Sequence, residues 1–98
     1  MAKRLTSVFT DDMDTCIFTG SPYIERHHIF SGNPNRKLSE QYGFVVPLRH
    51  DLHPNGVAAN PKYAADIDKY LKQKAQTYFE NHYGSREEFI NIFGKSWL

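Results

Sequence analysis

The sequence predicts a small α+β domain in which a pair of short strands precedes a long helix and a short C-terminal helix. Its 98 residues suit a single domain with a modest core. Two stretches with apolar alternation or rich in Val and Phe, residues 23–30 and 43–48, are typical of strands. Apolar residues at helical spacing follow Asn60. These observations predict the strand pair and the long helix.

The segments around the two strands are expected to be less regular. Residues 6–15 mix apolar residues with an acidic run, which indicates an irregular or short-strand entry. After the first strand, the Ser-Gly-Asn-Pro run of residues 31–34 breaks regular structure. A short helix is expected over residues 36–41.

The two C-terminal helices carry sequence signals at their ends. Asn60 is a suitable N-cap, and Pro61 follows at the first helical position, where its missing N–H is not needed. Gly84 should end the long helix, and Ser85 with Glu88 predicts a capping box for the last helix. We expect the core face to consist of Tyr63, Ile67, Tyr70, Leu71, Tyr78 and Phe79, with Phe89, Ile90, Phe93 and Trp97 packed on it.

Charge and composition bear on nucleic-acid binding, on membrane location and on the cellular compartment of the protein. The net charge of +1 is low for a dedicated nucleic-acid binder, so any basic surface must come from local clustering. No run approaches the ~20 apolar residues of a membrane span, and no signal peptide is evident. A single cysteine agrees with a reducing compartment. We therefore expect a cytoplasmic protein without a membrane partner. The candidate basic cluster is Arg26, Arg36, Lys37 and Arg49, and the alternative is that these are ordinary solvated charges.

Histidines carry the strongest functional signal. Adjacent residues of a strand point to opposite faces, so His27 and His28 can perform different tasks. One ring can bind a metal while the other transfers a proton. A second cluster, His50, Asp51 and His53, could meet them in space and complete a metal site. The alternative is that both clusters are surface decoration.

Further motifs accompany the histidines along nearly the whole chain. Together they resemble the HNH endonucleases (His-Me finger proteins with the ββα-metal fold), and most closely a phage and prophage subfamily. In that subfamily, Cys-x-x-(Cys or Thr)-Gly is followed by Glu-x-His-His-Ile-Phe and then by an Asn-Arg-Lys-x-Ser-Glu-x-x-Gly loop. A Val-x-Leu strand that leads to a His comes next. A Gly-Val-His-x-Asn turn, a long helix and an Ile-Phe-Gly-Lys-x-Tyr-Leu tail complete the pattern. The matching segments are Cys16 to Gly20, Glu25 to Phe30, Asn35 to Gly43, Val46 to Leu48, His53, Gly56 to Asn60 and Ile92 to Leu98.

The resemblance implies one HNH-like domain over residues 1–98, with its core motif at 16–60 and C-terminal helices at 60–94. The fold would be a ββα-metal domain with a short antiparallel strand pair, a long helix and a short C-terminal helix. The function would be that of a metal-dependent DNA endonuclease or nickase. DNA is then the expected partner, and a homodimer is one state such proteins adopt.

The resemblance also assigns roles. It makes His28 the general base, and His27 and His53 the ligands of a divalent cation, Mg²⁺ or Mn²⁺, with Ni²⁺ or Zn²⁺ as alternatives. The subfamily has a further His where this chain has Ala58, so one expected ligand is missing. Asp51, His50 or Asn60, or water and substrate phosphate, could fill its place. The second ring nitrogen of His28 would be oriented by Asn35 or by a backbone carbonyl.

Many HNH proteins also carry four cysteines around a structural zinc. Here only Cys16 stands at such a position, with Thr19, Arg49 and Leu52 at the others, so thiolate ligation of the usual kind is impossible. We expect no structural zinc. Packing and turn hydrogen bonds, with Gly20, Ser21 and Pro22 as turn residues, should hold this knuckle instead.

Two further interpretations remain. The chain could be a catalytically degenerate HNH-like phage accessory protein that binds DNA or a protein partner. It could also be a small structural metal-binding or assembly module whose histidines contribute only stability.

Overall fold

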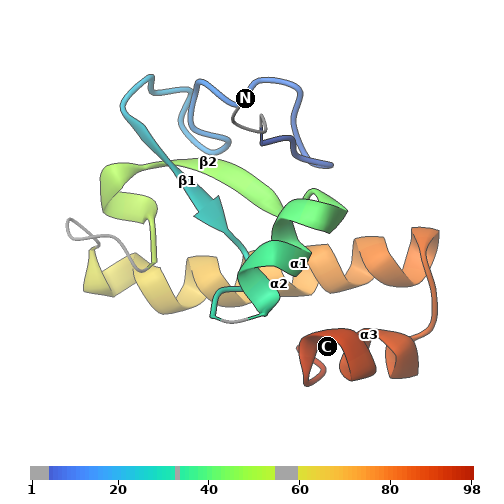
Figure 1. The fold of residues 1–98 in the computed structure, drawn as a ribbon. Coiled ribbons are helices and arrows are strands. Elements are labelled where there is room, and N and C mark those ends of the chain that lie inside the picture. Colours follow the sequence, from blue (N-terminus) through green and yellow to red (C-terminus); the bar gives the residue numbers. More distant parts are fainter. Residues whose placement is uncertain (1–4, 33, 55–59) are drawn as a thin grey trace.

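An antiparallel pair of strands lies at the centre of the fold. The computed structural model describes residues 5–32, 34–54 and 60–98. Strand β1 (Ile24–His28) lies beside β2 (Val45–Arg49), and in the described part of the chain these two strands make up the sheet (Figure 1). Both strands overlap the stretches predicted from the sequence.

The register of the pair separates the two neighbouring histidines. His27 lies opposite Val46, and His28 lies opposite Val45. Because residues opposite each other point to the same face of a sheet, His27 belongs to the face of Val46 and His28 to that of Val45. Both rings are buried, with exposed fractions of 2% and 8%.

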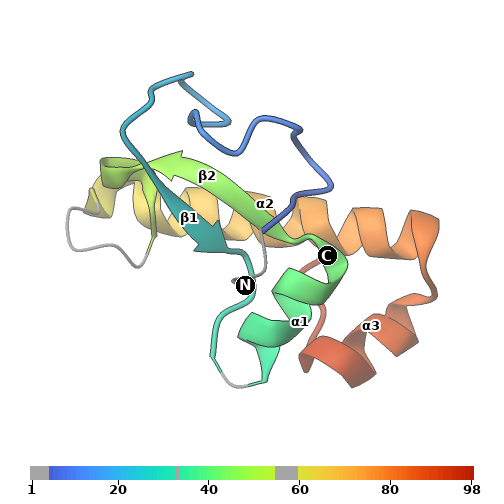
Figure 2. The ribbon, with the colours of Figure 1, turned by 45° about the horizontal axis from the view of Figure 1, so that its top comes forward.

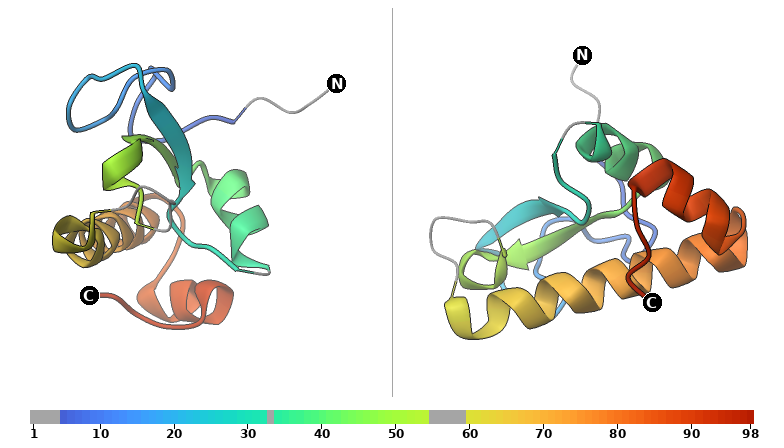
Figure 3. Two further views of the ribbon diagram at one scale, coloured as in Figure 1. Left: turned by 90° about the vertical axis from the view of Figure 1, so that its left-hand side faces the viewer. Right: turned by 90° about the horizontal axis from the view of Figure 1, so that it is seen from below.

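Four helical segments surround the strands: α1 (Asn35–Tyr42), the 3₁₀ turn η1 (His50–Leu52), α2 (Pro61–His82) and α3 (Arg86–Phe93). The strands run along the first half of α2, and α3 folds back beside its second half (Figure 3). The irregular N-terminal segment lies beside β2 (Figure 2), where the Ile17 N–H donates to the Pro47 carbonyl and Phe9 contacts Tyr78 of α2. The described residues thus form a small, compact α+β domain with two antiparallel strands and three α-helices, as the sequence predicts.

Helix α1 is tied to the end of β1 and stops sharply. The buried Ser39 hydroxyl accepts from the Phe30 N–H at 3.0 Å and donates to the Phe30 carbonyl at 2.8 Å. Gly43 ends the helix with φ +74°, and a Cβ there would lie 2.9 Å from the Val8 Cγ1 atom. The positive φ and the close approach of Val8 both favour glycine at this position, and the Ser39 hydrogen bonds tie α1 to the residues that follow β1.

The predicted caps of the last two helices are confirmed. The Asn60 side chain accepts from the Lys62 N–H, and Pro61 opens α2. Ser85 and Glu88 form the capping box of α3. Helix α2 ends at His82, just before Gly84.

The predicted core stripe is wrong in part. Leu71 and Phe79 are buried, but Tyr63 and Tyr70 are 42% and 51% exposed, and Ile90 of α3 is 37% exposed. The strands and α3 cover a narrower face of α2 than the apolar pattern suggests, because aromatic side chains on its flank remain open to solvent. The buried face of α2 consists of Leu71, Ala75, Gln76 and Phe79.

One hydrophobic core joins the strands to the helices. Its largest side chains are Phe44 and Leu48 from the strand region, Phe79 from α2 and Phe89 from α3. Among the described helices, none combines the length and the apolar character that a membrane crossing would need.

Candidate functional site

The first element of the site is a pair of imidazoles from distant parts of the chain. His27 projects from β1, and His53 follows η1, the turn that leaves β2. Their ring centroids lie 4.8 Å apart, with the planes at 79°. Because η1 contacts the start of α2, the packing of this turn places His53 against the strand.

Both rings have a buried nitrogen without a hydrogen-bond partner among the described residues, namely His27 Nε2 and His53 Nδ1. Burial, followed by the positive charge of a protonated His53 and of Lys72, lowers the pKa of His27 from 6.5 to about 3. His27 is therefore neutral at physiological pH, and a neutral ring keeps a lone pair that can bind a cation. Buried unsatisfied polar atoms are rare in proteins and call for an explanation.

His28 has a carboxylate partner. Its Nε2 atom lies 2.9 Å from Oε1 of Glu40, which α1 presents to the strand. An ionised carboxylate can only accept hydrogen bonds, so His28 carries its proton on Nε2 and its lone pair on Nδ1 when Glu40 is charged. The sequence pointed to Asn35 or a backbone carbonyl as the orienting group, and the structure places Glu40 there.

A pocket brings these groups together. Its volume is about 340 Å³, and it lies where the end of β1 meets His53. Two arginines contribute to its walls, so the pocket combines imidazoles with fixed positive charge. Its lining consists of Arg26, His27, His28, Ser31, Arg36 and His53.

The arginines differ in their surroundings. Arg26 forms an ion pair with Asp14 at 3.2 Å, in which both side chains are well exposed, and such surface pairs are weak. Arg36 forms no ion pair within the described parts of the chain. Both guanidinium groups can therefore turn toward an anion that enters the pocket.

The donor set is compatible with a divalent cation but incomplete. His27 and His53 supply two nitrogen atoms that nothing else in the described structure satisfies. Across residues 5–32, 34–54 and 60–98, no group of three or more His, Cys, Asp or Glu side chains could hold a metal ion. Ala58, where the resemblance expects a third ligand, lies outside the described residues.

Two asparagines that the sequence suggested for the site form hydrogen bonds with backbone groups instead. Asn35 Nδ2 donates to the Phe93 carbonyl at 3.3 Å. Asn60 Oδ1 accepts from the Lys62 N–H at 3.0 Å as the cap of α2. Neither is among the described residues that line the histidine pocket.

The other charged candidates pair with neighbours. His50 Nδ1 lies 2.7 Å from Oε2 of Glu25. Arg49 donates to both carboxylate oxygens of Asp51, at 2.6 and 2.9 Å, which lowers the pKa of that carboxyl. Lys37 is exposed on α1. None of these lines the histidine pocket in the described structure.

The knuckle before β1 is held as predicted, by turn hydrogen bonds. The Cys16 N–H donates to the Ser21 carbonyl, and the Gly20 N–H donates back to the Cys16 carbonyl, both at 2.8 Å. The neighbouring Ile17 N–H reaches the Pro47 carbonyl of β2. Cys16 itself is buried in the core.

A larger pocket of about 470 Å³ lies between the knuckle, η1 and the start of α2. It is lined mainly by apolar surface, including the exposed aromatic rings of Phe18, Tyr63 and Tyr70. No histidine lines it among the residues that the structure describes. This pocket is the larger of the two, but the histidines capable of acid–base chemistry line the smaller one.

Comparison with known proteins gives no relative: no protein-family model, no curated protein and no solved structure matches this chain. The site must therefore be interpreted from its own chemistry.

Sequence reasoning missed two residues near the site. Glu40 was visible only as part of the Asn-Arg-Lys-x-Ser-Glu motif, whose function the spacing does not reveal. Lys72 lies in the middle of α2, and no motif marks it. Its charge acts on His27 because of the way α2 lies against the strands.

Proposed function

We propose that this chain is a metal-dependent DNA endonuclease or nickase of the HNH type, with a ββα-metal fold. His28 is the general base, and His27 and His53 hold the divalent cation. The pocket that joins two unsatisfied imidazole nitrogens to a carboxylate-bound histidine supports this proposal most directly.

The residues of the chain divide the work of phosphodiester hydrolysis. His28 accepts a proton from the attacking water at Nδ1, which is the task of a general base. Glu40 holds Nε2–H and stabilises the imidazolium that forms, much as a carboxylate supports a catalytic histidine elsewhere. When bound, a divalent cation would neutralise the charge that grows on the phosphate and the leaving oxygen.

The charges around the pocket favour an anionic substrate. Arg26 and Arg36 line the pocket, and guanidinium groups bind phosphate oxygens in a bidentate manner. The same charges disfavour a cation in the absence of substrate. We therefore propose that the cation is bound more tightly when a DNA phosphate supplies further oxygen ligands.

The ligand set also bears on the choice of metal. Imidazole nitrogen suits nickel and zinc, whereas phosphate and water oxygens suit magnesium and manganese. An assay should therefore include all four ions.

The test is cleavage of supercoiled plasmid with each ion, comparing the wild-type protein with His28→Ala. Wild type should nick or cut the plasmid, and His28→Ala should lose at least about a hundredfold in rate, since a general base contributes ~10²–10⁴-fold. The matched control is His82→Ala, because His82 is exposed on α2 and stacks on Tyr78, away from the pocket. Cleavage that survives in His28→Ala would refute the assignment.

A second candidate function is a silent DNA-binding domain. It is favoured by the supply of only two metal ligands in the described structure. This candidate predicts DNA binding that weakens with salt, and no cutting with any ion by wild-type protein.

A further inference from the structure

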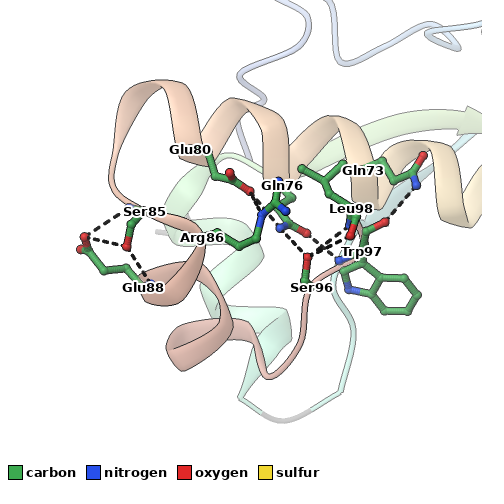
Figure 4. A network of polar contacts seen from close by, with 9 residues as sticks. All are labelled: Gln73, Gln76, Glu80, Ser85, Arg86, Glu88, Ser96, Trp97 and Leu98. Carbon is green, nitrogen blue, oxygen red and sulfur yellow. Dashed lines mark hydrogen bonds and ion pairs between the residues drawn. The ribbon is translucent and has the colours of Figure 1, made fainter.

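The C-terminal tail is held against α2 by buried polar contacts (Figure 4). Gln76 is fully buried, and its Oε1 accepts from the Trp97 N–H at 2.7 Å while its Nε2 donates to the Ser96 hydroxyl at 3.0 Å. Gln73 Nε2 donates to the Trp97 carbonyl at 2.9 Å. Gln76 Nε2 also donates to Glu80 at 2.9 Å within α2, so a displaced tail would leave the buried Oε1 atom without its donor, which favours one position of the tail.

This arrangement sets Trp97 beside two lysines. The Lys72 ammonium lies 4.4 Å from the centre of the indole ring, and the Lys95 ammonium lies 4.2 Å from it. Both distances are within the range of cation–π attraction. Lys72 also forms an ion pair with Asp68 at 2.8 Å, whereas Lys95 pairs with no carboxylate of the described residues.

The lysines and Trp97 line a pocket that adjoins the histidine pocket. It has a volume of about 220 Å³, and Ser31, just beyond β1, contributes to the walls of both pockets. The walls of this second pocket include Phe30, Ser31, Asn35, Lys72, Lys95 and Trp97.

We propose that Lys72, Lys95 and Trp97 form a phosphate-binding subsite for the DNA strand whose neighbouring phosphodiester group lies in the histidine pocket. This proposal rests on the proposed function, in that DNA enters the histidine pocket. The ligand class follows from the charge, because two ammonium groups with one carboxylate partner are complementary to an anion. The continuity through Ser31 favours the phosphates of a single polymer over an isolated small anion.

The indole ring of Trp97 restricts the conformations of the two lysine side chains in this subsite. Lysine side chains lose considerable rotamer entropy when they are fixed, and attraction to a ring that the tail already holds in place reduces their freedom before the ligand arrives. Preorganisation of this kind strengthens binding without additional interactions. The buried hydrogen bonds that hold the tail therefore contribute to ligand binding as well as to the stability of the fold.

The experiment measures binding apart from cleavage. All proteins carry His28→Ala and are kept in EDTA, and a fluorescein-labelled DNA duplex is titrated at several salt concentrations. The test variant is Lys72→Gln with Lys95→Gln. The matched control is Lys69→Gln, because Lys69 is an exposed lysine of the same helix that lines neither pocket.

The double variant should bind at least about tenfold more weakly than the control at low salt. The slope of log K against log salt should fall by about two, one for each ammonium group that no longer neutralises a phosphate. Lys95→Gln alone, an exposed change that spares the Lys72 ion pair, should lower the slope by about one. A double variant that matches Lys69→Gln in affinity and slope would overturn the proposal.

A second readout is direct. Trp97 is the only tryptophan of the chain, so its emission should change when DNA binds to the parent protein with intact lysines. Unchanged emission at saturating DNA, or no DNA binding at all, would also overturn the subsite. If the lysine variants lose binding but wild type never cleaves DNA, the subsite stands and the nuclease assignment fails.

Discussion

His27 is held neutral by its surroundings. It is 2% exposed, and its pKa lies near 3 against 6.5 for an ordinary histidine. Between these values the unfolded chain binds a proton that the folded chain does not. The free energy of unfolding of the metal-free protein must therefore fall as the pH drops below 6.5 toward 3, and His27 has no such effect above 6.5.

We predict a loss of about 2 kcal/mol at pH 5 relative to pH 7.5 from this one residue, at ~1.4 kcal/mol per pH unit. Urea unfolding in EDTA at both pH values measures it. The comparison is with His27→Asn, whose side chain does not titrate. Equal pH dependence in the two proteins would show that His27 titrates normally in the folded state.

Glu40 is the positioning residue that the structure adds to the site. Glu40→Gln keeps the size of the side chain but removes the charge that stabilises protonated His28. We predict that cleavage falls by at least about tenfold, since removing the carboxylate behind a catalytic histidine lowers the rate by up to ~10⁴-fold, while metal affinity is unchanged.

The control for Glu40→Gln is Glu87→Gln, an exposed residue in the first turn of α3. Unchanged metal affinity in Glu40→Gln, beside slower cleavage, separates a positioning role from a structural one. Cleavage by Glu40→Gln as fast as by Glu87→Gln would contradict the role assigned to Glu40.

At the scale of elements, the tail and α2 depend on one buried amide. Gln76→Ala removes the acceptor of the Trp97 N–H and the donor to Ser96. We predict a loss of about 1–3 kcal/mol in the free energy of unfolding and a red-shifted Trp97 emission as the tail loosens. Gln73→Ala should cost less, since Gln73 is only partly buried and holds the tail through one hydrogen bond. Equal effects of the two changes would contradict this account.

Element boundaries could be predicted because their signals are local. Asn60, Pro61 and the Ser85–Glu88 capping box act within one turn of the helix they begin, so the sequence alone identifies them. The exposure of Tyr63 and Tyr70 could not be predicted, because it depends on how the strands lie across α2. Local pattern shows that a helix is amphipathic but not how much of its apolar face is covered.

At the scale of the whole molecule, the site exists only through the packing of three segments. The sequence drew attention to two histidine clusters, and the resemblance selected His27, His28 and His53 from them; these three residues line one pocket. Glu40 and Lys72 could not be assigned, because their proximity depends on the placement of α1 and α2 against β1. The tail offered a motif, but its hydrogen bond to Gln76 joins residues about twenty positions apart and is set by tertiary packing.

The central claim is that His27 and His53 together hold a divalent cation beside His28. Isothermal titration with Ni²⁺, which suits imidazole ligands, tests it on the isolated protein. The test variant is His27→Gln with His53→Gln, and the matched control is His50→Gln with His82→Gln, which removes two histidines that lie outside the pocket. We expect one site in the wild type, its retention in the control and in His28→Ala, and its loss in the test variant. An ion that binds the test variant as tightly as the wild type, or no binding to the wild type, would contradict the claim.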